Sequence, residues 1–270
     1  MTLLGPFSAL GCPFEVEASP SIARVLAEAL DDLRGDDIPR RRLKATLDRS
    51  GAWTVGLDGE RPQRGSDLDD ALYNILSAVN LLAAREAASE CAVFHGGSVA
   101  LDGHGVVFVG HSRAGKSTLT AALTRAGHGY IADEVTAISS DARVRGFHRP
   151  IGLRAGGAAA VGLEVPPGPF SRTYPLRVGK WAALVDEVPL AQLVILDRIC
   201  DAQSPVDVGF TPLEPAEALF MLVNHALARS TESQAFRRIE ALVREVPTLV
   251  LRYTDVHEAV RTVEAFALDP

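Results

Sequence analysis

The chain has 270 residues, of which 47% are hydrophobic and 23% charged, a composition typical of a soluble globular protein. Asp and Glu number 34 against 27 Lys and Arg, and the net charge of −7 argues against general affinity for nucleic acid or an anionic membrane. Three widely separated cysteines, Cys12, Cys91 and Cys200, lack the spacing of metal ligands, so we expect reduced thiols.

The N-terminus shows no basic stretch followed by an apolar core, and no apolar run approaches the roughly 20 residues of a membrane span. We therefore expect a cytoplasmic protein with no nucleic-acid or membrane partner. The length allows one large domain, or a core domain with a smaller attachment.

Residues 1–90 are expected to form a smaller α+β region. A helix is predicted to open at Ser19-Pro20 and to end by Gly35, and Trp53–Leu57 has the pattern of a short strand before the turn Asp58-Gly59. A longer helix is predicted from Asp67 to Glu90, with Ser66 or Asp67 as its N-cap. Its apolar residues recur on one face: Leu68, Leu72, Ile75, Val79 and Leu82.

Residues 91–270 are expected to form the main domain. Strands are predicted at 92–94, 98–101 and 106–109, with a turn at 102–105, then a glycine-containing loop, a helix over 117–126, and strands at 130–132 and 135–138. Residues 155–168 indicate a loop or short helix. Further along, the pattern predicts strands at 193–196 and 248–253 and helices over 215–228 and 257–266. Strand, glycine loop, helix and strand in this order predict an α/β nucleotide-binding core.

The loop has the form G-x-x-x-x-G-K-[ST], the Walker A or P-loop pattern, at Gly110–Ser117. Gly110 allows a sharp turn after the strand, and Gly115 removes a side chain where the backbone must approach a phosphate. Lys116 is expected to reach the β- and γ-phosphates, and the Ser117 hydroxyl to ligate Mg²⁺. The predicted nucleotide-binding residues are Gly110, His111, Ser112, Arg113, Ala114, Gly115, Lys116, Ser117 and Thr118.

A P-loop does not by itself name the reaction. No D-x-x-G or N-K-x-D follows Ser117, which argues against a switch GTPase. Asp133 and Glu134 end the strand after the P-loop helix, where one carboxylate can take a proton and the other can hold a metal. The alternative is a solvated acidic pair at the end of a strand.

Other candidates are less specific. His95 lies in Phe94-His-Gly-Gly97, and it is either a packed histidine or a partner of a carboxylate or phosphate. Arg149 and Arg154 flank Pro150 and Gly152, and guanidinium groups suit phosphate or carboxylate recognition. Asp197 ends an apolar strand and resembles a Walker B acid, or simply a capping residue.

The segments Phe94–Gly97, Gly105–Thr118 and Gly127–Glu134 resemble the catalytic core of HPr kinase/phosphorylase and of HPr-kinase-related proteins, including lasso-peptide kinases. The resemblance is specific over residues 93–138, weaker over 144–154, and absent from the first 90 residues. It implies an α/β P-loop core of the HPr kinase and PEP carboxykinase type. The sequence departs from the family at Arg113-Ala114, where small residues are usual, and at Glu134, where the HPr enzymes have Asp.

The resemblance also implies roles. Asp133 would be the general base, His95 would neighbour it and the reacting phosphate, and Lys116 would hold the nucleotide phosphates. Mg²⁺ would be bound by Ser117, Glu134 and Asp133, and the acceptor by Arg149 and Arg154.

We therefore expect an ATP- and Mg²⁺-dependent kinase that phosphorylates a hydroxyl, with Ser of a peptide or carrier protein as the first candidate. The alternatives are a small-molecule hydroxyl of sugar or amino-acid type, and a nucleotide-binding regulator without catalysis. Relatives of HPr kinase are often oligomers, which makes a homo-oligomer an open expectation.

Overall fold

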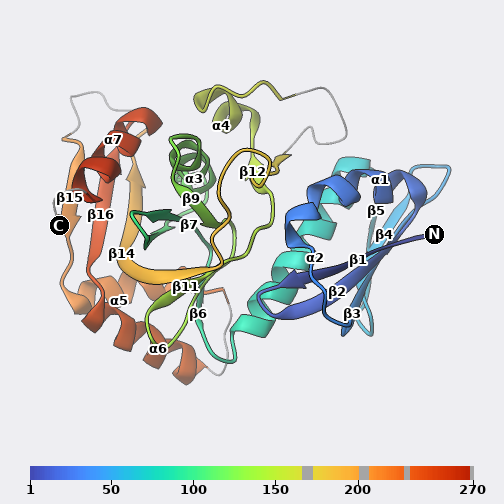
Figure 1. The fold of residues 1–270 in the computed structure, drawn as a ribbon, viewed down its shortest axis with the longest axis horizontal. Helices are drawn as coiled ribbons and strands as arrows, with labels where there is room; N and C mark the ends of the chain where they lie inside the picture. The colour runs from blue at the N-terminus through green and yellow to red at the C-terminus, as the bar shows by residue number, and fades with distance from the viewer. Residues whose placement is uncertain (166–172, 201–206, 228–231, 268–270) are drawn as a thin grey trace.

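The computed structural model describes residues 1–165, 173–200, 207–227 and 232–267. The fold is mixed α/β, with a five-stranded and a nine-stranded sheet and a small two-stranded one. Figure 1 shows the N-terminal sheet and its helices on one side of the molecule and the larger sheet on the other. Among the described residues, no helix combines the length and apolar character that crossing a bilayer requires.

The five-stranded sheet contains β1 (Thr2–Ala9), β2 (Cys12–Ala18), β3 (Arg41–Leu47), β4 (Trp53–Leu57) and β5 (Gln63–Gly65), in that spatial order. Its pairs are antiparallel except β2 and β3, which run parallel and are joined through helix α1 (Pro20–Ala29) and a 3-10 turn at Asp31–Leu33. The predicted helix after Ser19 and strand at 53–57 are thus present, whereas β1, β2, β3 and β5 were not predicted.

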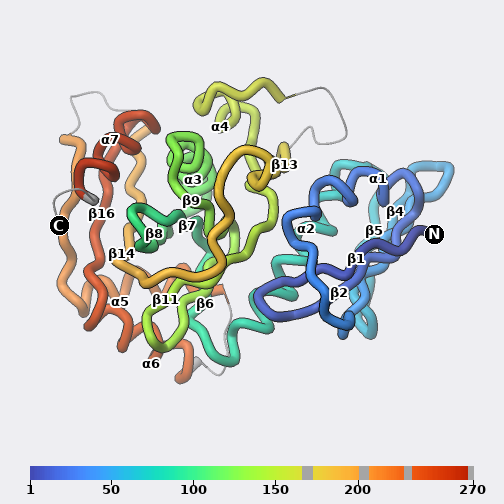
Figure 2. The backbone as a smooth tube through the Cα atoms, viewed as in Figure 1, coloured from blue at the N-terminus to red at the C-terminus, as the bar shows by residue number. Residues whose placement is uncertain are grey.

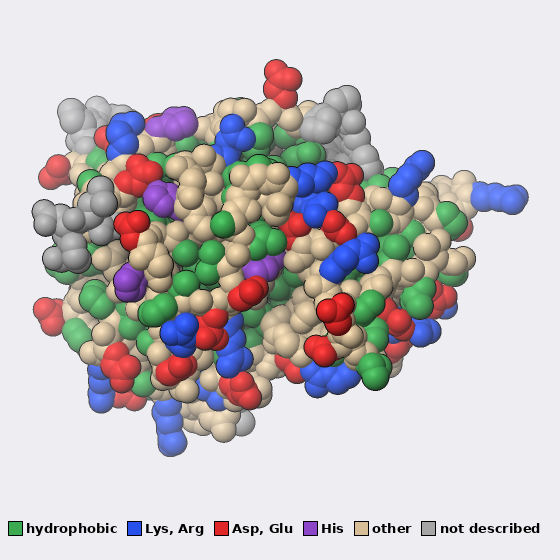
Figure 3. All heavy atoms as spheres, viewed as in Figure 1, with side chains coloured by type: hydrophobic (Ala, Val, Ile, Leu, Met, Phe, Trp, Pro, Cys, Tyr) green, Lys and Arg blue, Asp and Glu red, His purple; other side chains and the backbone are tan. Residues whose placement is uncertain are grey.

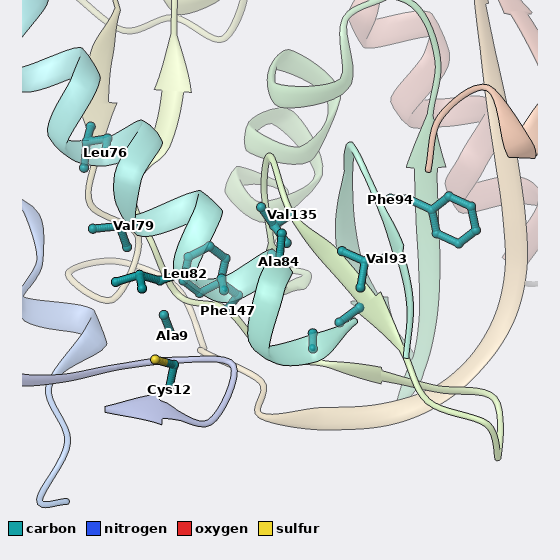
Figure 4. Packing of buried hydrophobic residues seen from close by; sticks show 14 of the residues in the cluster. Ala9, Cys12, Leu76, Val79, Leu82, Ala84, Val93, Phe94, Val135 and Phe147 are labelled. Atoms are coloured by element: carbon teal, nitrogen blue, oxygen red, sulfur yellow. The ribbon is translucent and has the colours of Figure 1, made fainter. Parts of the chain in front are cut away.

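Helix α2 (Leu68–Ala87) joins the two parts of the chain, and in Figure 2 it runs between them. Asp67 is the N-cap and accepts a hydrogen bond from the amide of Asp69 at 3.0 Å. The helix stops three residues before the predicted Glu90. Its buried positions include the predicted Leu72, Ile75, Val79 and Leu82. Figure 4 shows Leu76, Val79 and Leu82 projecting from this helix among buried side chains of both parts, so one continuous core joins them.

The large sheet has the path β6-β10-β11-β14-β8-β7-β9, with β16 beside β14 and β15 beside β16. These strands are β6 (Ala92–Phe94), β7 (Gly96–Leu101), β8 (His104–Val109), β9 (Gly129–Ala132), β10 (Thr136–Ile138), β11 (Arg143–Arg145), β14 (Glu187–Arg198), β15 (Gly209–Pro212) and β16 (Thr248–Tyr253). β8, β14 and β16 are mutually parallel, and the P-loop follows the carboxyl end of β8.

Alternation along β8 explains how this sheet is covered on both faces. Val107 and Val109 belong to the core cluster that includes helices α5 (Pro215–Val223) and α6 (Glu232–Glu245). Val106 and Phe108 belong to the other cluster, with helices α3 (Lys116–Arg125), α4 (Ala155–Ala160) and α7 (Val256–Ala267). A strand buried on both faces reads as a continuous apolar run, which is the pattern that predicted it.

Two predicted elements need correction. Residues 135–138 do not extend the strand at 130–132: β9 pairs with β7, whereas β10 pairs with β6, because Glu134 adopts a left-handed φ of 69° that breaks the strand. The helix predicted over 215–228 ends at Val223, and its last residue lies outside the described part. The loop or short helix predicted over 155–168 begins with the short helix α4, and residues 166–168 lie outside the described part. The remaining strands, β12 (Ile151–Leu153) and β13 (Tyr174–Leu176), form a separate hairpin-like pair.

Candidate functional site

The P-loop backbone takes the conformations that its glycines permit. Gly115 is the N-cap of α3 and has a φ of 94°, and a Cβ there would lie 2.3 Å from the Tyr253 hydroxyl oxygen. That hydroxyl donates to the Ala114 carbonyl at 2.5 Å, so β16 fixes the loop from behind. Arg113 has a φ of 70° without being glycine, which costs conformational energy and indicates that its neighbours determine the loop shape.

Lys116 is buried at the start of α3, only 7% exposed. Its Nζ donates to the carbonyls of Gly110 at 2.9 Å and His111 at 3.1 Å, so the side chain folds back over the loop. Burial lowers the pKa of this ammonium, against the opposing effects of Glu134 and then Asp133. The lysine ammonium therefore lies beside the loop at the N-terminus of α3, the end of a helix that favours anions.

Asp133 is 1% exposed and lies beneath the floor of the site. Its Oδ2 accepts from the Gly152 amide at 3.3 Å, while Oδ1 has no hydrogen-bond partner. Burial, followed by the charge of Glu134, raises its pKa to about 7, against the lowering effects of Arg149, the Ser117 hydroxyl and the Gly152 amide. This carboxyl group can therefore exchange a proton near neutrality. It is not the solvated strand-end residue of the alternative interpretation.

Glu134 and His95 form a second pair at the cavity surface. The His95 Nδ1 lies 3.2 Å from the Glu134 carbonyl oxygen and 3.5 Å from its Oε2. A hydrogen bond to the carbonyl requires the proton on Nδ1, which leaves Nε2 as an acceptor in the neutral ring. The backbone amide of His95 donates to the His225 carbonyl at 2.9 Å, so this residue is held at both ends.

A side chain at either of the two glycines after His95 would clash with neighbouring atoms. A Cβ on Gly96 would lie 2.8 Å from the Phe108 carbonyl, which would force β7 away from β8. A Cβ on Gly97 would lie 2.2 Å from Thr120 Oγ1 and 3.5 Å from Asp133 Oδ1. The absence of side chains at Gly96 and Gly97 therefore lets β7 pack closely against β8, α3 and Asp133.

Histidine side chains gather behind the P-loop. The rings of His111 and His225 lie 5.4 Å apart, edge to face. Burial, with the nearby charges of His111, Lys116 and His95, lowers the pKa of His225 to about 4. This imidazole is therefore neutral at physiological pH. Sequence reasoning did not single out His225, because nothing in its local pattern links it to a loop more than 100 residues earlier.

Arg149 and Arg154 both reach the site but differ in environment. Arg149 is 4% exposed, and its Nη1 lies 3.9 Å from Asp133 Oδ2. Arg154 is an exposed residue at the N-cap position of α4. Asp197, in contrast, pairs with Arg252 at 3.0 Å on the sheet surface, and it is not among the residues lining the cavity.

These groups surround a cavity of about 610 Å³. Ten of the predicted site residues line it: His95, Ser112, Arg113, Gly115, Lys116, Ser117, Thr118, Glu134, Arg149 and Arg154. Gly110, His111, Ala114 and Asp133 are not among the residues that line it. In Figure 3, acidic and basic side chains are interspersed over the face shown.

One wall of the cavity comes from α2, which sequence reasoning did not assign to the site. Its lining residues recur at helical spacing on one face: Asp69, Tyr73, Leu76, Ser77 and Asn80. Tyr73 is 59% exposed, and Asn80 Oδ1 is buried without a hydrogen-bond partner. The opposite end of the cavity is lined by Arg198, Asp255 and Val256. The sequence signal that could have assigned α2 to the site was the polar stripe opposite its apolar face.

The oxygen groups here fit a hard cation. Ser117, Glu134 and Asp133 offer hydroxyl and carboxylate oxygens, the ligands Mg²⁺ prefers, and Asp133 Oδ1 lacks a protein partner. Within the described residues, no three His, Cys, Asp or Glu side chains form a metal cage. Mg²⁺ usually binds through one or two carboxylates together with substrate phosphates, so this donor set fits a metal carried by a nucleotide.

The chain matches no known family model and no curated protein sequence. Among solved structures, it is similar to the HPr(Ser) kinase/phosphatase from Coxiella burnetii, with a TM-score of 0.37 and 10% sequence identity. That similarity covers 66% of this chain and 99% of the other. At this level the similarity assigns neither a family nor an activity to this chain.

Proposed function

We propose that this protein is a kinase that transfers the γ-phosphoryl group of ATP, with Mg²⁺, to a hydroxyl group. The proposal includes a P-loop core of the HPr kinase and PEP carboxykinase type in residues 91–270, with residues 1–90 as a distinct N-terminal region. Catalysis would rest on positioning and charge neutralisation by the P-loop, with base assistance from Asp133.

The observation that carries the proposal is the buried Asp133 carboxyl behind the P-loop. A P-loop alone serves motors, switches and kinases, but a carboxylate with a pKa raised to about 7 next to the P-loop serine suits proton removal from an acceptor hydroxyl. A purely structural acid of this burial would be expected to have both oxygens satisfied, whereas Oδ1 is not.

Mg²⁺ would be held by Ser117 and Glu134, with Asp133 as a further oxygen donor. When bound, it would neutralise charge on the β- and γ-phosphates. Lys116 would leave its loop carbonyls to reach these phosphates, and His95 would keep Glu134 oriented through its hydrogen bond to the Glu134 carbonyl.

The acceptor is proposed to enter between the acidic pair and α2, because His95 and Glu134 share the cavity with that wall. Ser of a peptide or carrier protein is the first candidate. A small-molecule hydroxyl is the second, favoured by one observation: a cavity of about 610 Å³ has the size of small-ligand pockets. Arg149 and Arg154 are the proposed acceptor-side cations.

The test compares ATP turnover and Mg·ADP affinity of the wild type, Asp133→Asn and Asp186→Asn. Asp186 is a matched control because its side chain is 99% exposed. We expect Asp133→Asn to bind ADP within about twofold of the wild type but to lose roughly 10²- to 10⁴-fold in turnover, the usual contribution of a general base. Turnover would be assayed with a serine-peptide library and with a panel of polyols, sugars and hydroxy amino acids.

Nucleotide binding without turnover of any acceptor, in wild type and variant alike, would refute the kinase proposal and favour a regulator. Turnover that Asp133→Asn leaves intact would remove Asp133 as the base. Phosphorylation confined to the small molecules would select the second acceptor class over the first.

A further inference from the structure

Arg149 is a buried cation whose hydrogen-bonding groups are not satisfied. Its side chain is 4% exposed, and both Nε and Nη1 lack a hydrogen-bond partner. The nearest carboxylate oxygen, Asp133 Oδ2, lies 3.9 Å from Nη1, beyond hydrogen-bonding distance. Arginine cannot shed its charge, so a buried guanidinium with unused donors is unfavourable unless a ligand supplies the missing acceptors.

The backbone holds this residue firmly. The Arg149 carbonyl accepts from the buried Tyr130 hydroxyl at 2.8 Å, and its amide donates to the Phe147 carbonyl at 2.9 Å. The Phe147 amide in turn donates to Ile131 in β9 at 2.8 Å, directly before the acidic pair. The backbone of Arg149 is thus fixed to the same strand, β9, that leads to Asp133.

Space is kept open beside the guanidinium. Arg149 and Gly152 both line the cavity, and a Cβ on Gly152 would lie 4.0 Å from Arg149 Nη2 and 3.0 Å from Thr173. Arg149, the adjacent Gly152, the P-loop lysine and Glu134 all line this cavity. These features describe a built site for a small anion next to the P-loop.

We propose that Arg149 binds the phosphoryl group during transfer, as a catalytic residue distinct from the P-loop; this rests on the proposed function. In the step, the bond between the γ-phosphorus and the β–γ bridging oxygen breaks and leaves ADP. A bond forms between the acceptor oxygen and the γ-phosphorus, and the acceptor proton passes to Asp133. Arg149 donates hydrogen bonds to the non-bridging oxygens of the moving group, while Lys116 neutralises the donor side.

This role separates Arg149 from a simple counterion of Asp133. A counterion would affect folding and all nucleotide states alike. Substituting a residue that contacts the phosphoryl group during transfer should change the affinity for ADP little. It should greatly weaken the affinity for ADP bound with a phosphoryl mimic, because only that complex presents oxygen or fluorine acceptors to the guanidinium.

The experiment measures calorimetric affinity for Mg·ADP with and without aluminium fluoride, in the wild type, Arg149→Gln, Arg149→Lys and the control Arg244→Gln. Arg244 is an exposed helix residue that pairs with Glu240. We expect aluminium fluoride to tighten wild-type and control binding. Arg149→Gln should bind Mg·ADP within about twofold of the wild type but lose about 10- to 100-fold of that tightening, the usual range for charge-assisted hydrogen bonds. Arg149→Lys keeps the positive charge but loses the two-pronged guanidinium, so its tightening by aluminium fluoride should lie between those of the wild type and Arg149→Gln.

The proposal is overturned if Arg149→Gln keeps the full tightening, if it loses affinity for both complexes by the same factor, or if the wild type binds Mg·ADP without any tightening. Should Arg149→Gln not fold, Arg149→Lys decides: tightening equal to the wild type overturns the proposal, and a loss of at least about threefold with unchanged ADP affinity supports it. A wild type that binds no ADP is a different result, because it refutes the proposed function and takes this inference with it.

Discussion

Replacing Gly115 by alanine tests whether Tyr253 and the P-loop form one interlocked unit. A Cβ at residue 115 would lie 2.3 Å from the Tyr253 hydroxyl oxygen but 3.5 Å from the ring carbon that bears it. Gly115→Ala must therefore displace the hydroxyl, whereas the ring can stay. Removing the hydroxyl with Tyr253→Phe abolishes the contact and leaves an ordinary van der Waals separation.

The magnitudes follow from these contacts. Alanine at a φ of 94° costs about 1–2 kcal/mol of strain, and displacing the hydroxyl loses its hydrogen bond to Ala114, about another 1 kcal/mol or more. Tyr253→Phe loses the same hydrogen bond, about 1–2 kcal/mol, since burial raises the phenol pKa to about 12 and keeps it a donor at neutral pH. The double variant loses that bond only once, so it should be more stable than additivity predicts by about 1 kcal/mol.

The free energy of unfolding in urea is measured for both single variants and the double variant. Gly127→Ala serves as the control, because Gly127 has a φ of 109° and nothing within 4 Å of its Cβ position, so it reports strain alone. Coupling between Gly115→Ala and Tyr253→Phe smaller than about 0.3–0.5 kcal/mol, the usual error of additivity, would refute the interlocked arrangement.

Three further changes have defined outcomes. The pKa of His225 is lowered to about 4 in the folded protein, so the unfolded chain binds a proton there first as pH falls below 6.5. The free energy of unfolding should therefore drop by about 1 kcal/mol between pH 7 and 5, after allowing for the partial exposure of the ring. His225→Gln should reduce this pH dependence when unfolding is measured in urea. Asp67→Ala removes the N-cap bond to the Asp69 amide and should cost about 1 kcal/mol of unfolding free energy. Asp32→Ala should cost about 1–2 kcal/mol, since this carboxylate accepts from Arg177 Nε at 2.7 Å and its loss leaves Asp31, 2.6 Å from Arg177 Nη2, as the carboxylate partner of that cation.

Each of these changes has its own control. The pH dependence of His225→Gln is compared with the wild type, and parallel curves would contradict the assigned pKa. Ser66→Ala tests the other cap that the sequence allowed, and it should change stability by less than about 0.5 kcal/mol. Glu28→Gln breaks an exposed ion pair with Lys180 close to Asp32, and it should also cost less than about 0.5 kcal/mol. A Glu28→Gln variant as unstable as Asp32→Ala would show that burial is not the deciding factor.

The sequence predicted the strand–loop–helix around the P-loop because its signals are local. Four apolar residues before Gly110 can only be a strand buried on both faces, and Lys116–Arg125 follows as a helix with its N-cap glycine in place. The N-terminal strands were missed for the opposite reason. β1 contains glycine and proline, and β2 and β3 pair in parallel across an intervening helix, a non-local contact that propensity does not report.

The site was predictable where chemistry and spacing coincide and not where distant segments meet. Asp133 and Glu134 were singled out in the sequence because they follow a strand. The sequence did not show that they differ in burial: Glu134 has a left-handed φ of 69° and turns outward, while Asp133 is buried. The α2 wall and His225 come from elements that no motif connects to the P-loop, so only the tertiary packing brings them together. Which groups hold ligands stays a prediction until the affinities above are measured.

Helix α2 presents one face to the shared core and the other to the cavity, and this has a thermodynamic consequence. A ligand that spans the cavity from the P-loop to the α2 wall would bind only when both parts of the chain are folded. Such a ligand would add to the coupling that the shared core already provides, so at saturation the N-terminal sheet and the large sheet would be stabilised together. A nucleotide that contacts the P-loop alone would stabilise the large sheet directly and the N-terminal sheet only through that core.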